Sequence, residues 1–198
     1  KDNYWVNTRL FGNLWAELDL MKDLTFRTSF GLDHSTFWGY NMSKKDPEFS
    51  ESPGTNYFNE EANSGYNLQW QNTLTYSKRF GDVHSLTVLL GSDALRGGLG
   101  RTLRGRRYNY LFEDNIDTWT LQMGENNNQR QTESWYWGET ALFGVFGRVD
   151  YGFADKYLFT GIVRRDGASR FSQSQRYGTF PSASFGWRVS EEAFMENT

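Results

Sequence analysis

Hydrophobic and polar side chains alternate along much of this 198-residue chain. From Leu24 to Tyr40, the even positions carry mainly apolar or aromatic residues and the odd positions mainly small or polar ones. A period of two puts the two sets on opposite faces of a β-strand, and this run is much longer than the usual strand of about five or six residues. Similar alternation predicts strands at Leu10 to Leu20, Tyr66 to Ser77, Val83 to Leu95, Gly138 to Tyr151, Tyr157 to Arg165 and Ser182 to Ser190.

The connections between these strands alternate between short and long. Tight turns are expected at residues 21–23, 79–82 and 152–155, and long polar loops at 41–65, 96–137 and 166–178. Short turns at one end and long loops at the other are typical of an up-and-down outer-membrane barrel, with periplasmic turns and extracellular loops. The sequence therefore predicts an all-β chain, a segment of about seven antiparallel strands from a large transmembrane outer-membrane β-barrel.

Composition agrees with strands and does not settle their surroundings. The chain holds 16 Phe, 11 Tyr, 8 Trp and 20 Gly, which favours strands over helices. Tyr151 and Tyr157 flank one predicted turn, as in the aromatic girdles of membrane barrels. A soluble barrel or sandwich remains the alternative, because alternation does not say whether the apolar face meets a core or lipid.

Charge and cysteine usage exclude several classes of protein. The formal net charge is −3, so nothing in the charge predicts a nucleic-acid partner. Cysteine is absent, which removes disulfides and thiolate chemistry. No apolar run is long enough for a transmembrane helix, which needs roughly 18 residues. The chain begins at Lys1 without Met, and we interpret it as a piece of a longer protein.

No catalytic, cofactor or metal site is predicted. His34 and His84 fall within strands, without a second ligand at motif spacing, and no GxSxG, HExxH, Walker A or Rossmann fingerprint occurs. The acidic run from Glu113 to Asp117 lacks the spacing of an EF-hand calcium loop. A carbohydrate-active β-sandwich enzyme would need a carboxylate pair at a suitable separation, which sequence alone does not reveal.

The region from Leu142 to Asn197 carries several rigid submotifs: "FGRVDY", "DKYL", "RRDG", "SRF", "YG", "FPS" and "GWR". In this order and spacing they resemble the SusC/RagA family of TonB-linked outer-membrane transporters. The stretch from Leu74 to Leu95 looks like the preceding hairpin of that family, whereas residues 1–40 agree with it in pattern only.

This resemblance implies a fold, a function and partners. Family members are barrels of about 22 strands with an amino-terminal plug, so residues 1–198 would be part of one β-barrel domain, about a third of its wall. It implies a TonB-dependent importer of oligosaccharides or peptides in the outer membrane of a Bacteroidota-like cell. The implied partners are TonB, outer-membrane lipid and a SusD-like lid lipoprotein, and no cofactor is implied. The alternative is a non-transporting surface adhesin or interaction β domain.

Two groups of residues are candidates for contact with substrate or the lid. Five residues could form a polar cluster in an extracellular loop, with ion pairing inside the loop and solvation as the simpler interpretation: Arg164, Arg165, Asp166, Arg170 and Arg176. Aromatic residues of the long loops could stack on sugar rings or peptide side chains, or pack the loops together. The specific candidates are Arg165, Asp166, Arg170, Arg176, Tyr108, Tyr110, Trp119 and Trp135.

The alternation also assigns faces. Phe30, Leu74, Phe143 and Phe185 are predicted to face lipid. Polar residues at the opposite positions are predicted to line the lumen or contact the plug: Arg27, Asp33, Gln69, Gln71, Arg148, Asp150 and Arg188.

Overall fold

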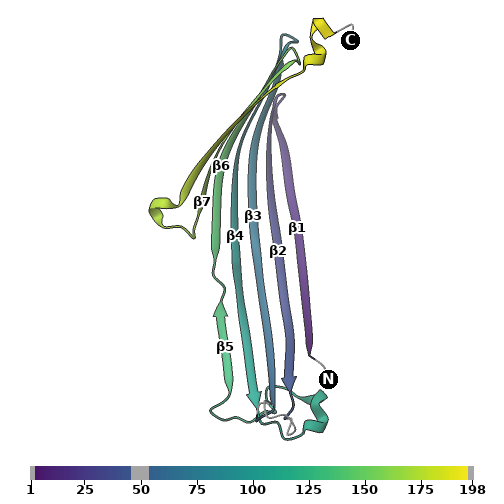
Figure 1. Cartoon of the computed structure of the whole chain (residues 1–198), viewed down its shortest axis with the longest axis vertical. Coiled ribbons are helices and arrows are strands. Elements are labelled where there is room, and N and C mark those ends of the chain that lie inside the picture. Colours follow the sequence, from purple (N-terminus) through teal and green to yellow (C-terminus); the bar gives the residue numbers. More distant parts are fainter. Residues whose placement is uncertain (1–2, 46–53, 196–198) are drawn as a thin grey trace. The chain divides into compact units, whose positions relative to one another are not determined.

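A computed structural model describes residues 3–45 and 54–195 of the chain. It contains eight antiparallel strands in one sheet, hydrogen-bonded in the order β1-β2-β3-β4-β6-β7-β8, with β5 also paired to β4 (Figure 1). The strands are β1 (Tyr4–Met21), β2 (Leu24–Ser43), β3 (Tyr57–Phe80), β4 (His84–Tyr108), β5 (Gln131–Tyr136), β6 (Thr140–Phe153), β7 (Tyr157–Ala168) and β8 (Tyr177–Trp187). Short 3-10 helices are η1 (Glu113–Thr118), η2 (Gln173–Gln175), η3 (Val189–Glu191) and η4 (Ala193–Met195).

The predicted fold class is confirmed, and the boundaries differ from those expected. β3 and β4 have 24 and 25 residues, so both run far into segments that the sequence predicted as loops. β5 is an additional strand within the predicted loop 96–137. Arginine and glycine dominate the far half of β4, "LRGGLGRTLRGRRY", which hides the apolar alternation there. Within the described residues, no helix is long and apolar enough to cross a membrane.

The chain divides into two compact units. Unit 1 comprises Lys1–Phe11, Asp33–Asn67 and Gly98–Glu139, and unit 2 comprises Gly12–Leu32, Leu68–Gly97 and Thr140–Thr198. Strands β1 to β4 contribute residues to both units, β5 belongs to unit 1, and β6 to β8 belong to unit 2.

The register of unit 2 gives its sheet two chemically distinct faces. In β4 and β6, Val88 pairs with Val149, and Thr87 pairs with Asp150. Paired residues of neighbouring strands share a face, and successive residues alternate between faces. The apolar face of unit 2 is made of Leu86, Val88, Leu90, Phe143, Val145, Val149, Tyr151, Tyr157, Phe159, Val163, Tyr177, Ala183, Phe185 and Trp187. The polar face of unit 2 includes Thr87, Asp93, Arg148, Asp150, Thr160, Arg164, Asp166, Ser182 and Ser184.

Tight turns in unit 2 use backbone conformations that match the twist of a hairpin. Gly81 and Asp82 have φ of 53° and 57°, and Ala154 and Asp155 have φ of 51° and 55°. Two successive residues with positive φ are the signature of a type I′ turn, whose twist suits antiparallel strands. The predicted turns at 79–82 and 152–155 are therefore confirmed, each within a residue or two of its expected position.

Unit 1 has a small hydrophobic core of its own. Phe58, Tyr110 and Trp119 are buried, and Tyr40, Met42, Ile116 and Leu121 pack against them. Asn56 fixes the loop after β4, because its side-chain nitrogen donates to the Tyr110 carbonyl at 2.8 Å and its side-chain oxygen accepts from the Tyr110 amide at 2.6 Å. The predicted loop 96–137 is thus largely folded.

Candidate functional site

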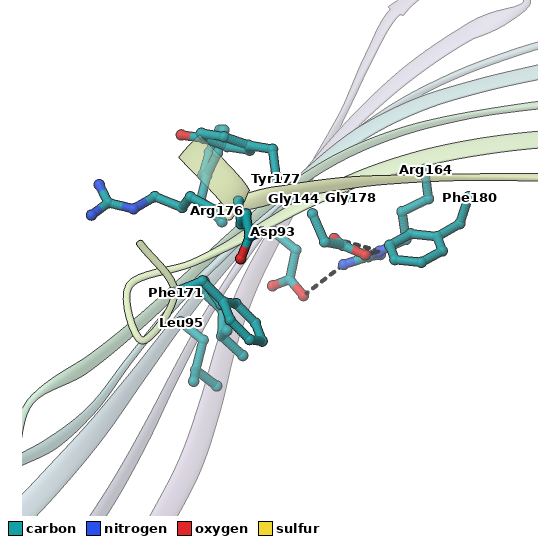
Figure 2. A pocket seen from close by; sticks show the side chains of 15 residues that line it. Asp93, Leu95, Gly144, Arg164, Phe171, Arg176, Tyr177, Gly178 and Phe180 are labelled. Atoms are coloured by element: carbon teal, nitrogen blue, oxygen red, sulfur yellow. Dashed lines mark hydrogen bonds and ion pairs between the residues drawn. The ribbon is translucent and has the colours of Figure 1, made fainter. Parts of the chain in front are cut away.

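The strongest candidate site lies on the polar face of unit 2, around the guanidinium of Arg164. Its Nε donates to both carboxylate oxygens of Asp166, at 2.7 and 2.8 Å. Its Nη2 lies 3.8 Å from Oδ2 of Asp93 on β4, and its Cζ lies 5.2 Å from the ring centre of Phe146. Figure 2 shows Arg164 directed toward Asp93 across the sheet. One guanidinium is therefore held between two carboxylates from two strands.

A glycine provides the room for this cluster. Gly144 pairs with Asp93 on one side and with Asp166 on the other. A Cβ at position 144 would overlap the Asp166 carboxylate and would lie 2.8 Å from Nη2 of Arg164. The sequence therefore needs glycine here so that Arg164 and Asp166 can lie flat against β6.

A cavity of about 460 Å³ opens beside the cluster. Its charged lining residues are Asp93, Arg164, Asp166 and Arg176, and its apolar lining includes Leu95, Leu142, Phe171 and Phe180. Small-molecule sites typically have a mostly apolar lining with a small number of precisely placed polar groups. This cavity has the composition needed to hold a polar ligand with an apolar or ring-shaped face.

A second polar network lies further along the same face. Arg148 Nε and Nη2 donate to the two Asp150 oxygens at 2.7 and 2.9 Å, and Thr160 Oγ1 donates to Asp150 Oδ1 at 2.7 Å. Arg148 and Asp150 are two of the residues predicted to line a lumen. The structure places both on the polar face and pairs them with each other.

The other residues predicted to line the lumen lie in different parts of the structure and have different partners. Asp33 accepts two hydrogen bonds from Arg9, at 2.8 and 2.7 Å, and Arg27 lies 3.9 Å from Glu17. Gln69 Nε2 donates to Asp93 Oδ1 at 3.3 Å, which ties it to the Arg164 cluster, and Gln71 is a half-buried residue of β3. Arg188 follows the last residue of β8, so the expectation that it lies within a strand is wrong.

Two aromatic loop candidates are buried. Tyr110 and Trp119 are 4% and 2% exposed, and their rings stack at 4.3 Å. Burial raises the pKa of Tyr110 to about 12, and its hydroxyl donates to the Thr120 carbonyl at 2.9 Å. Trp119 Nε1 donates to the Phe112 carbonyl at 3.0 Å. Both side chains stabilise the loop and present no ring to a ligand.

The other two aromatic candidates lie on strands rather than in loops. Tyr108 ends β4 and meets Tyr57 edge-on at 6.4 Å. Trp135 lies in β5 with the Arg104 guanidinium 5.4 Å from its ring centre, while Arg104 donates to Oε2 of Glu61 at 2.9 and 2.8 Å. Their expected loop positions are wrong, because β4 and β5 extend into that region.

The predicted arginine cluster comes together only in part. Arg165 and Asp166 lie in β7, not in a loop, and they point to opposite faces of the sheet. Only Arg164 pairs with Asp166. Arg165, Arg170 and Arg176 have no hydrogen bond or ion pair from their side chains to any described residue, so ion pairing inside the loop does not account for them.

No family model matches the chain. It is 31% identical over 186 residues to "TonB-dependent receptor P3" of Formosa agariphila, covering 94% of the chain and 18% of that relative. It is 30% identical over 147 residues to "TonB-dependent receptor SusC" of Bacteroides thetaiotaomicron, covering 73% of the chain and 14% of that relative. "TonB-dependent receptor P39" of Formosa agariphila matches 99% of the chain at 29% identity. The chain thus spans less than a fifth of the length of these relatives.

Solved structures agree on the fold. The RagAB peptide importer in its "closed-closed" state superimposes with a TM-score of 0.81, over 98% of this chain and 21% of that one, at 21% identity. The "open-open" state gives a TM-score of 0.80. The chain is a SusC/RagA-like segment of a TonB-dependent receptor. The resemblance identified in the sequence is confirmed.

The SusC/RagA-like segment contains site residues that the sequence analysis missed. Asp93 and Gly144 were not selected, and Arg164 was named in the cluster without being singled out for contact. Even and odd positions of a strand lie on opposite faces, and this alternation could have distinguished the two arginines. Arg164 shares its face with Thr160 and Ile162, whereas Arg165 shares the other face with Val163. The partnership of Asp93 with Arg164 required the register between β4, β6 and β7.

Among described residues, no cluster of three or more His, Asp or Glu side chains could hold a metal ion. The side chains of Glu113 and Asp114, in the acidic run weighed as a calcium loop, lie outside the described part of the structure.

Proposed function

We propose that the segment forms part of the wall of a TonB-dependent outer-membrane importer in a Bacteroidota-like cell, as one piece of a single β-barrel domain. The apolar face of unit 2 meets lipid, and the polar face of unit 2 lines the lumen or contacts the plug. The transported substrate is an oligosaccharide or a peptide, captured together with a SusD-like lid lipoprotein and released after TonB acts on the plug. This assignment is not enzymatic.

The observation that supports this proposal is the contrast between the two faces of unit 2. Phe143, Val163 and Phe185 are 51%, 50% and 70% exposed on the apolar face. A soluble monomer rarely exposes so large a continuous apolar surface, whereas a barrel wall requires one. β8 has 11 residues, and a tilted strand needs about 9 to 11 to cross a bilayer.

Aromatic residues at the turn end of the apolar face support the same function. Tyr157 stacks on Trp187 at 6.5 Å and on Phe153 at 6.3 Å. Amphipathic rings favour the boundary between hydrocarbon and water. The turn between β6 and β7 therefore belongs at an interface, with the apolar face starting immediately beside it.

Spin labels test which face meets lipid. In the full-length parent reconstituted in vesicles, labels at Phe30, Leu74, Phe143 and Phe185 should be relaxed by oxygen and shielded from a water-soluble nickel complex. Matched labels at Ser182 and Ser184 of the polar face should show the reverse. Burial of the first four labels in a protein core, or their exposure to bulk water, would refute the membrane wall.

Partners and substrate need a separate experiment. Affinity purification of the parent from its own membranes should recover a SusD-like lipoprotein in stoichiometric amount. Cells carrying Arg164→Gln in the parent should take up their oligosaccharide or peptide nutrient more slowly, with unchanged amounts of the protein in the membrane. Equal uptake by wild type and variant would remove the Arg164 cluster from the substrate path.

A further inference from the structure

Arg165 interrupts the apolar face of unit 2 near the loop end. It pairs with Val145 and Thr179, and it shares its face with Val163 and Tyr177. Its Cζ lies 5.2 Å from the ring centre of Tyr177, and this ring contact is the only side-chain interaction of its guanidinium with the described residues. A charged group at this place has its apolar stem among hydrophobic neighbours and its five donors free.

Arg176 provides a second guanidinium, on the residue that precedes Tyr177 in the chain. It is exposed and makes no side-chain hydrogen bond or ion pair with a described residue. Figure 2 shows Arg176 and Tyr177 on one side of the ribbon and Asp93, Arg164 and Phe180 on the other. Arg176 also lines the cavity beside the Arg164 cluster, and its guanidinium points away from the carboxylates of that cluster.

The position along the strand matches a membrane boundary. Arg165 is the ninth residue of β7 counted from Tyr157, and a tilted spanning strand needs about 9 to 11 residues. The turn end of the apolar face is marked by Tyr157 and Trp187, and the loop end by Arg165, Tyr177 and Arg176. If the former lie at one interface, the latter lie at the other, at the level of lipid headgroups.

We propose that Arg165 and Arg176, on either side of Tyr177, bind the phosphate of an outer-leaflet lipid headgroup. The guanidinium is suited to this ligand because its planar fork donates two parallel hydrogen bonds to phosphate oxygens. The adjacent apolar face accommodates the acyl chains of the same lipid. This inference rests on the proposed membrane wall, and it replaces contact with substrate or lid as the role of these two arginines.

Native mass spectrometry of the full-length parent tests the site. The protein is reconstituted in phosphatidylcholine vesicles with or without diphosphorylated lipid A, extracted in mild detergent, and weighed with its retained lipid. Arg165→Gln and Arg176→Gln should each lower lipid A retention about fivefold, the factor that corresponds to ~1 kcal/mol for a basic residue near a membrane surface. The double variant should lower it roughly 25-fold if the two effects add.

Control variants and lipids distinguish a specific headgroup site from a general effect of positive charge on lipid A retention. Lys22→Gln removes one positive charge in the turn between β1 and β2 and should leave retention unchanged. Arg165→Lys should restore part of the retention lost in Arg165→Gln, because it keeps the charge without the fork. Dephosphorylated lipid A should be retained weakly by every variant, and inorganic phosphate should not compete unless the site binds free anions.

The outcomes distinguish this inference from the proposed function. Failure of the wild-type protein to insert into vesicles would refute the membrane wall. Insertion with equal lipid A retention by wild type and double variant would refute the headgroup site alone. Equal loss in Lys22→Gln, or equal retention of dephosphorylated lipid A, would also overturn it.

Discussion

Unit 1 and unit 2 differ in how their apolar side chains are buried. Unit 2 leaves an apolar face about half exposed, and its opposite face carries the ion pairs Arg148–Asp150 and Arg164–Asp166. Unit 1 has a buried cluster of Phe58, Tyr110 and Trp119, built where the loop after β4 folds onto strand residues. The first arrangement requires an apolar environment from outside the chain, and the second supplies its own.

The difference shows that one sheet can combine two sources of stability. β3 and β4 have 24 and 25 residues, more than twice the number of about 9 to 11 needed to cross a bilayer. Under the proposed function, the parts of these strands beyond that length do not meet lipid. Side-chain stacking and loop packing therefore take its place in unit 1.

The largest expected effect concerns the core of unit 1. Trp119→Ala should lower the stability of the loop after β4 by about 3 to 5 kcal/mol, because it removes a buried ring that stacks on Tyr110. Hydrogen exchange of residues 109–130 in the full-length protein measures this as lost protection. Trp135→Ala removes a 41%-exposed ring of the same unit and should change protection by about 1 kcal/mol or less. Similar losses in both variants would contradict a core centred on Trp119.

The next effect concerns the apolar face of unit 2. Val149→Arg, on the apolar face of β6, should lower the free energy of unfolding by about 2 to 4 kcal/mol in a bilayer, because the charge would face hydrocarbon in the proposed membrane wall. Ile162→Arg is the matched control, because Ile162 pairs with Arg148 on the polar face. Denaturant titration of vesicle-inserted protein measures both. A greater loss in Ile162→Arg would mean that the two faces are assigned the wrong way round.

A smaller effect is expected at the glycine that accommodates the Arg164 cluster. Gly144→Ala should lower the free energy of unfolding by about 1 kcal/mol, because the new Cβ displaces the Asp166 carboxylate from Arg164. Gly147→Ala is the control on the same strand, where a Cβ would lie 3.4 Å from Leu90, an ordinary contact. Denaturant titration should separate the two variants. Equal stability would show that the Arg164–Asp166 pair needs no space at position 144.

How far the sequence predicted the structure follows the same division. In unit 2 the two faces could be predicted from alternation, because apolar residues such as Val145, Val149 and Phe185 share one face of the sheet. In unit 1 both faces carry charges and glycines, with Gly100 and Arg104 on one face of β4 and Arg101 and Gly105 on the other. Alternation therefore disappears although the strand continues. Pairing there depends on partners distant in sequence, such as Glu61 for Arg104.

The candidate site was predictable to the same degree. Arg148 and Asp150 were selected because polar residues recurred in strands, whereas Asp166 was selected as part of a predicted loop cluster. The alternation of faces along β7 separates Arg164 from Arg165. The contribution of Asp93 could not be predicted, because 71 residues separate it from Arg164 and only the pairing of β4 with β6 and β6 with β7 brings them together. Burial of Trp119 could not be predicted either, because the sequence does not show whether a polar loop packs onto the strands or extends into solvent.

The smallest expected effect concerns Glu192, which follows η3 and accepts hydrogen bonds from three residues. Its carboxylate accepts hydrogen bonds from Tyr157 at 2.7 Å, Trp187 at 3.0 Å and Lys156 at 3.3 Å, and these hold the pKa of Glu192 below its usual value. A carboxylate with a lowered folded-state pKa stabilises the fold above its unfolded pKa and loses that contribution as the pH falls through the folded one. Because the group is only partly buried, solvent still screens the interaction and the effect is small.

Glu192→Gln should therefore remove a pH-dependent part of the protection of the turn between β6 and β7. Hydrogen exchange of residues 153–157 should show protection in the wild type that declines as the solution is acidified below the ordinary glutamate range. In Glu192→Gln the same amides should exchange faster at neutral pH and show little further change on acidification. Glu191→Gln alters a neighbouring carboxylate that makes none of these contacts, so it should retain the wild-type profile. An identical pH profile in all three proteins would mean that aromatic packing of Tyr157 and Trp187, rather than Glu192, holds this end of the wall.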